Sequence, residues 1–126
     1  MARGSQRGKF LLENILGTPP PPPPQNVPPL KEDHRGVPLK GTLRQRFEAH
    51  RSNPTCASCH AFLDPMGFAF EHFDAIGRWR ELDNGAKIDT TGQLISGQKF
   101  DGVPELRKLL VEYRKKDFTD CLAENL

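Results

Sequence analysis

Apolar positions recur at helical spacing in several separate stretches of the chain, and each stretch predicts a helix. The clearest start signal is Thr42, because Gln45 follows three residues later and completes a capping box. In that helix Leu43, Phe47 and His50 stand at i, i+4 and i+7 and therefore share one face. The predicted helices cover residues 8–16, 42–51 and 104–116, with one more beginning at Asp64-Pro65 and a last one capped by Asp117.

Proline and glycine interrupt these helical stretches. Six consecutive prolines, Pro19 to Pro24, follow a stop signal at Gly17 and predict a stiff polyproline II rod. A spacer lying over the surface of the domain is favoured over a ligand for a proline-binding groove. Residues 86–101 contain short extended pieces that predict one hairpin. The pattern therefore predicts a mainly α chain with an N-terminal polyproline strap and a small α+β C-terminal tail.

Composition narrows the class of protein. The chain has 126 residues, of which 36% are hydrophobic, and it contains 12 prolines and 11 glycines. This composition favours one domain of roughly 80–100 ordered residues and suggests that the core is completed by a cofactor or by a larger protein. Because 18 Lys+Arg nearly balance 16 Asp+Glu, a strongly basic nucleic-acid-binding protein is disfavoured. No apolar run approaches the ~20 residues of a membrane span.

One short motif carries recognisable chemistry. Cys56-Ala57-Ser58-Cys59-His60 is C-x-x-C-H, the attachment signature of c-type haem. The two thiols form thioethers with the haem vinyl groups, and the adjacent histidine lies where its imidazole can bind the iron. The motif predicts haem c as cofactor, held by Cys56, Cys59 and His60, in a c-type cytochrome-like helical module.

Two other sites share the C-x-x-C spacing and remain as alternatives. A zinc site needs further ligands of similar quality, and only Cys121, His34, His50 and His72 remain for that role. A thiol redox site of the thioredoxin type has a strand before the motif, whereas an Asn-Pro break and a capped helix precede this one. Haem is therefore favoured over both. Cys121 itself is expected to be a small buried hydrophobe.

The sixth position of the iron has three candidate ligands, His50, Met66 and His72. The choice matters because a His/Met pair gives a higher potential than two histidines, while an open position permits small-ligand chemistry. Phe62, Phe68 and Trp79 belong to an aromatic cluster that suits the walls of a flat apolar cofactor.

The two arginines beside Trp79, Arg78 and Arg80, suit either the haem propionates or a solvated turn.

A long stretch of the sequence resembles a known family. RGKFLLENILGTPPPPPPQNVPPL and TLRQRFEAHRSNPTCASCHAFLDPMGFAFEHFDAIGRWR resemble a planctomycete-type c-type haem domain family of unknown function. The later IDTTGQLISGQKFDGVPELRKLL and FTDCLAENL resemble the C-terminal domain that normally follows it. By position, His50 matches a recurring histidine of the family, whereas His72 stands at a usual asparagine and Met66 at a usual leucine or isoleucine.

The resemblance implies covalent haem binding and electron transfer by a module of a larger exported protein, either periplasmic or at the cell surface. It implies upstream domains and a redox partner protein, and it leaves the partner unidentified. The N-terminus lacks a signal-peptide pattern and the C-terminal module stops within its final helices, so we expect a fragment or a truncated gene product. Two alternative functions stay open: a haem enzyme or sensor with an open sixth position, and a structural or zinc-binding module of a surface protein.

These expectations divide the chain into four parts. Residues 1–17 form an N-terminal helical segment, and residues 18–41 form the proline-rich strap. Residues 42–82 form the haem-binding module, and residues 83–126 form a truncated C-terminal α+β domain.

Overall fold

The computed structural model describes residues 3–26 and 40–126. The helical elements are α1 (Arg3–Phe10), the π-helix η1 (Leu11–Ile15), α2 (Leu43–His50), α3 (Pro54–Phe68), α4 (Gly102–Tyr113) and α5 (Lys115–Glu124). The strands are β1 (Leu82–Asp83), β2 (Ala86–Lys87), β3 (Thr91–Gln93) and β4 (Lys99–Asp101). Helices dominate and the strands are short and antiparallel, which confirms a mainly α chain with a small β part.

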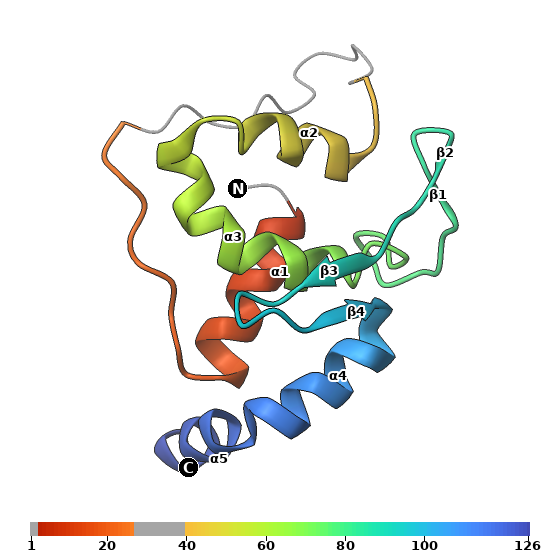
Figure 1. Cartoon of the computed structure of the whole chain (residues 1–126). Coiled ribbons are helices and arrows are strands. Elements are labelled where there is room, and N and C mark those ends of the chain that lie inside the picture. Colours follow the sequence, from red (N-terminus) through yellow and green to blue (C-terminus); the bar gives the residue numbers. More distant parts are fainter. Residues whose placement is uncertain (1–2, 27–39) are drawn as a thin grey trace.

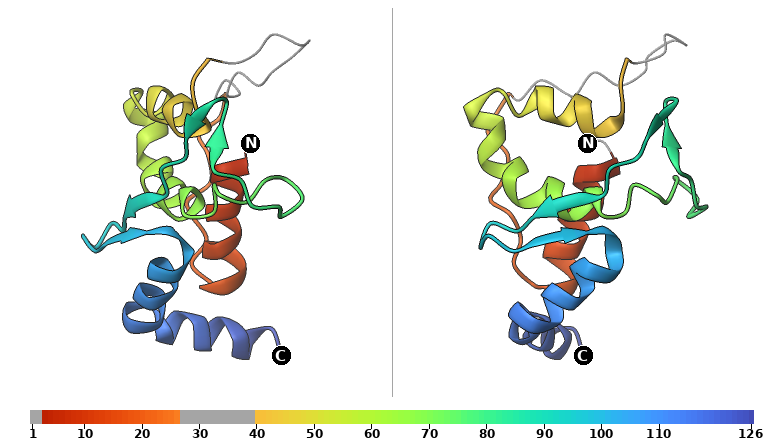
Figure 2. Two further views of the ribbon diagram at one scale, coloured as in Figure 1. Left: turned by 90° about the vertical axis from the view of Figure 1, so that its right-hand side faces the viewer. Right: turned by 45° about the vertical axis from the view of Figure 1, so that its right-hand side comes forward.

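Helices α1 and α3 cross at the centre of the molecule (Figure 1). Helix α2 lies beyond one end of this crossing, and α4 and α5 lie beyond the other. The views in Figure 2 show the same order, with the β1–β2 hairpin projecting from the side. None of the helices in the described ranges is long and apolar enough to cross a membrane.

The α1–α3 crossing is close enough to require glycine on both helices. A Cβ atom added at Gly8 would lie 1.8 Å from the carbonyl oxygen of Leu63, and one added at Gly67 would lie 1.8 Å from the carbonyl oxygen of Gly4. The first helix begins at Arg3, before the predicted start at residue 8, and so includes both of these α1 glycines. The prediction was too short because the small residues there have low helix propensity, and the same residues permit the crossing.

The main hydrophobic core joins both ends of the chain. Its buried members come from the N-terminal segment, α3, the β3–β4 hairpin and α4: Leu12, Leu16, Leu63, Met66, Ala69, Leu94, Phe100 and Leu106. A second cluster of Leu43, Phe47 and Phe68 packs α2 on α3. Fully burying a side chain of this size contributes about 1.5–3 kcal/mol. The second cluster therefore fixes the position of α2 on α3.

The predicted helix start at Asp64-Pro65 is wrong, because α3 runs without a break from Pro54 to Phe68 with Pro65 inside it. Proline inside a helix costs about 3 kcal/mol, since it removes one backbone hydrogen bond and crowds the preceding turn. Two nearby residues of the same helix, Leu63 and Met66, are buried in the core, and this packing holds the helix through the proline.

The final helix also differs from the prediction. It begins at Lys115, and Asp117 lies inside its first turn, where its carboxylate pairs with the guanidinium of Arg114. Asp117 is therefore not the capping residue. Only Arg114 separates the end of α4 at Tyr113 from the start of α5, so the last helix begins at Lys115, two residues before Asp117.

The β region contains two hairpins where one was predicted. The expected hairpin is β3–β4, in which Gly92 pairs with Phe100. The second is β1–β2, joined by Asn84-Gly85, and both of these turn residues have positive φ angles (51° and 80°). An Asn-Gly pair is a strong sequence signal for such a turn, and the sequence prediction missed it.

The strap leaves η1 beside the final helix. Residues 18–24 form neither helix nor strand, whereas the part of the predicted strap at residues 27–39 lies outside the described residues. The guanidinium of Arg114 donates to the Thr18 hydroxyl at 2.9 Å, and Cys121 is buried against Gly17. The expected burial of Cys121 is confirmed, and α5 anchors the start of the strap.

Candidate functional site

The C-x-x-C-H motif occupies the first turns of α3. Asn53 begins the helix by accepting a hydrogen bond from the Thr55 backbone N–H on its side chain, and Pro54 fits the first helical position. Residues three and four apart share one face of a helix, so Cys56, Cys59 and His60 lie on the same face of α3. The sequence analysis left this segment without an assigned helix.

Both motif cysteines are free thiols. Cys56 is buried, whereas Cys59 is partly exposed. The Cys59 sulfur lies 4.0 Å from the carbonyl oxygen of Pro21, so the strap passes beside this end of α3. On this face of α3, one thiol is thus buried and the other is partly exposed beside the strap.

The His60 imidazole is held at one of its two nitrogens. Nδ1 of His60 lies 2.9 Å from Oδ1 of Asp64, one helical turn further along α3. The Ser5 hydroxyl of α1 donates to the same Asp64 oxygen at 2.8 Å and lies 3.3 Å from Nδ1 of His60. With Nδ1 engaged by Asp64, Nε2 is the nitrogen that remains for binding a metal.

A second histidine lies against the first. His50 is the last residue of α2, and its ring centroid lies 5.1 Å from that of His60, with the ring planes at 80°. The ring of Phe47, one turn earlier on α2, contacts two rings of α3. Its centroid lies 5.9 Å from that of His60 and 5.9 Å from that of Phe68. The predicted capping box of Thr42 and Gln45 is confirmed, and it sets the start of the helix that carries His50.

The remaining sequence-predicted residues lie in different surroundings. Met66 is buried in the main core, and Phe68 is buried in the α2–α3 cluster. Phe62 is 41% exposed. Trp79 is 62% exposed and stacks on His72 with ring centroids 4.4 Å apart. Of the three candidate sixth ligands, the structure thus brings His50 to His60, buries Met66 in the core and pairs His72 with Trp79.

The arginines beside Trp79 differ in their contacts. Arg80 is held by the buried carboxylate of Glu71 at 2.8 Å and by Asp83 at 3.1 Å. Arg78 is exposed, and its backbone N–H donates to Asp74. That hydrogen bond is the main cause of a lowered pKa of Asp74. Arg80 therefore stabilises the segment after α3, while the Arg78 side chain faces solvent.

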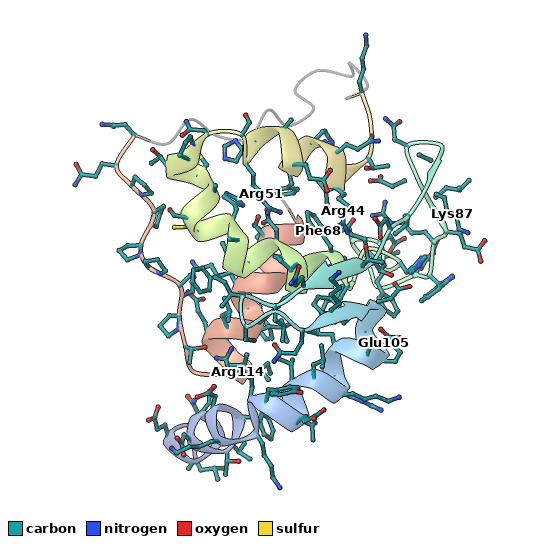
Figure 3. All side chains as sticks on the ribbon, in the orientation of Figure 1. Arg44, Arg51, Phe68, Lys87, Glu105 and Arg114 are labelled. Carbon is teal, nitrogen blue, oxygen red and sulfur yellow. The ribbon has the colours of Figure 1, made fainter. Side chains whose placement is uncertain are left out.

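A cleft of about 670 Å³ borders the neighbouring face of α3, which carries Ala57 and Ala61. Arg44 of α2 lies on its wall, with its guanidinium 4.9 Å from the centroid of the Phe68 ring. Figure 3 shows these two side chains close together beneath α2. The cleft therefore combines a charged rim with an aromatic wall.

Sequence reasoning missed two residues of the site, Ser5 and Asp64. Both are fully buried. The i, i+4 spacing of His60 and Asp64 on one helix is a signal that was available, but the assumed helix start at Asp64-Pro65 hid it. No sequence signal links Ser5 to a histidine 55 residues away. Among the described residues, no group of three or more His, Cys, Asp and Glu side chains is arranged to hold a metal ion.

A comparison with known proteins gives one match. The family described as PSCyt3, protein of unknown function (DUF1588), matches residues 3–83, which include every residue of the site described above. No curated protein and no solved structure matches the chain. Because the family match covers more than half of the sequence, the chain belongs to the PSCyt3 family of proteins of unknown function.

Proposed function

We propose that the chain is a c-type haem-binding, electron-transfer module of the planctomycete-type haem family and has a cytochrome-like helical fold. The observation that carries the proposal is the arrangement of His60. Its Nδ1 is held by Asp64, its Nε2 remains for a ligand, and two free thiols share its face of α3. Iron in a porphyrin needs only one or two side chains from the protein, and His60 with His50 supplies that number.

Each cysteine has a defined part in holding the haem. Cys56 and Cys59 would each hold the haem through a thioether, formed by addition of the thiol S–H across a vinyl group. Such an addition would consume no oxidant and would need thiols that are not in a disulfide, and neither motif cysteine is in one. The thioethers anchor the cofactor beside the first turns of α3.

The two histidines bind the iron from the protein side. His60 would bind the iron through Nε2, and His50, ahead of Met66, would supply the second protein ligand, because α2 carries it next to His60. When bound, haem c supplies an iron that carries one electron by cycling between the ferrous and ferric states. Phe47 and Phe68 exclude water from this side of the site, because both side chains are almost fully buried.

The same proposal sets the cellular context. Haem attachment of this type requires export, so the module works outside the cytoplasm as part of a larger protein. It exchanges electrons with a redox partner protein whose identity is open. The family match supports this proposal in that its range, residues 3–83, contains both motif cysteines and both histidines.

Replacing His50 tests the distal assignment. In His50→Ala the iron loses its sixth ligand, so we expect a change from a low-spin to a high-spin absorption spectrum and new binding of carbon monoxide. Lys40→Ala, an exposed change outside the site, is the control and keeps the low-spin spectrum.

Two results would redirect the proposal. A wild-type protein that itself binds carbon monoxide would point to the enzyme or sensor class, in which the sixth position is open. A low-spin His50→Ala variant would assign the distal position to another residue.

A further inference from the structure

We propose that Asp64 is a positioning residue that sets the donor strength of His60 toward the iron, and that Ser5 moderates it. This inference rests on the proposed function and deepens it. Asp64 touches neither the cofactor nor the reacting atoms and acts through the imidazole of His60.

Burial of the Asp64 carboxylate is costly. Its side chain has 0% exposure, and its Oδ2 atom has no hydrogen-bond partner among the described residues. A buried carboxylate with one unsatisfied oxygen is costly to the fold, by about 1–3 kcal/mol or more for a charged group. A leucine or alanine at this point of α3 would avoid that cost, so the carboxylate is better explained by its contact with His60.

Both side-chain contacts of Asp64 converge on one of its oxygens. Oδ1 of Asp64 accepts from the Ser5 hydroxyl and lies 2.9 Å from Nδ1 of His60. An oxygen that accepts from two groups is typical of a carboxylate, which has no proton of its own to donate. The Nδ1 proton of His60 then points at Asp64, and the hydrogen bond fixes both the tautomer and the orientation of the ring.

Ser5 and Asp64 lie on two helices that are packed rigidly against each other. Ser5 lies one residue after Gly4 and three before Gly8, at the crossing where α1 and α3 have their backbones in contact. The Ser5 hydroxyl is therefore held at a fixed distance from Asp64. Rigid supporting helices keep Asp64 at a constant distance from His60, and this constancy is needed if Asp64 is to set the donor strength of the imidazole.

The physical consequence has opposite signs for the two residues. A carboxylate on Nδ1–H makes the imidazole a stronger donor, which favours ferric over ferrous iron and lowers the midpoint potential. Asp64→Asn retains the shape and an accepting oxygen but removes the charge, so it raises the potential. Ser5→Ala removes a hydrogen bond that draws charge away from His60, so it lowers the potential.

The experiment is a potentiometric titration, followed by absorbance, of the full chain loaded with haem. We expect an upward shift for Asp64→Asn and a downward shift for Ser5→Ala relative to the wild type. Ser96→Ala is the matched control, because this serine lies outside the site in the β3–β4 hairpin, is exposed, and donates its hydroxyl to the side chain of Gln98. It leaves the potential unchanged.

A second readout separates donor strength from changes in solvent access. In the His50→Ala background the ferrous iron keeps His60 as its single axial side chain, and resonance Raman spectroscopy then measures the iron–histidine stretch. Adding Asp64→Asn to that background lowers its frequency.

Equal or absent shifts in Asp64→Asn and Ser5→Ala would overturn the inference while leaving the proposed function standing. Failure of the wild type to bind haem would overturn the proposed function, and the inference with it.

Discussion

Replacing Gly8 with alanine lowers the melting temperature of the chain steeply or prevents folding. The added methyl group would lie 1.8 Å from the carbonyl oxygen of Leu63, and both atoms belong to rigid helices. Relieving the overlap requires the two helices to separate, which opens the hydrophobic core on both sides of the crossing. We expect a loss of about 3 kcal/mol or more, a large part of the ~5–15 kcal/mol that stabilises an ordinary domain. Thermal unfolding followed by circular dichroism measures it.

The same helix offers a matched control. A Cβ atom at Gly4 would meet its nearest neighbour, the ring of Phe47, at an ordinary 3.6 Å. Gly4→Ala therefore leaves stability unchanged or raises it by up to ~1 kcal/mol through better helix propensity. Gly67→Ala, whose methyl group would meet the carbonyl oxygen of Gly4, behaves like Gly8→Ala. Similar melting temperatures for Gly8→Ala and Gly4→Ala would contradict the close crossing.

Replacing both motif cysteines with alanine abolishes covalent haem attachment. Neither Cys56→Ala nor Cys59→Ala alone removes both thioethers, so each single variant retains one bond and shows a shifted absorption band in the pyridine haemochrome assay. In the double variant no haem remains with the chain after acid-acetone extraction. Because Cys56 is buried, circular dichroism of the double variant is the check that loss of attachment follows from chemistry and not from unfolding.

The third cysteine provides the control for this experiment. Cys121 lies on α5, with its sulfur 3.5 Å from the Asn14 carbonyl oxygen, and it belongs to the anchor of the strap. Cys121→Ala therefore costs some stability and leaves both thioethers intact. Haem that stays covalently bound in the Cys56→Ala, Cys59→Ala double variant would show that the motif is not the point of attachment.

The parts of the fold that follow from local rules were predictable from the sequence. The Thr42–Gln45 capping box, the β3–β4 hairpin and the burial of Cys121 were each expected and are each present. These features depend on residues close together in the chain, where backbone chemistry and hydrophobic pattern act directly.

Other parts depend on contacts between distant segments. Glycines in the first part of α1 pack against the backbone of α3. Helix propensity alone predicts no helix there, because glycine is unfavourable in a helix. Helix α3 continues through Pro65 because its neighbours are buried, although proline locally favours a break. In both cases tertiary packing overrides the local preference.

The residues of the candidate site also fall into two groups, those predictable from local spacing and those that depend on contacts between distant segments. The motif residues and the face shared by Phe47 and His50 were available from spacing alone. The approach of His50 to His60 depends on how α2 packs on α3, and the Ser5–Asp64 contact depends on the α1–α3 crossing. A sequence pattern was therefore enough to name the proposed ligands, whereas the residues that orient His60 needed the structure.

The most direct test of the account is the absorption spectrum and intact mass of the chain produced, with a signal peptide added, in a host that carries the haem-attachment machinery. The account predicts a mass increase of one haem that survives denaturation, together with a sharp low-spin Soret band that carbon monoxide does not change. A chain that has its bare mass and no Soret band, although folded by circular dichroism, would contradict it.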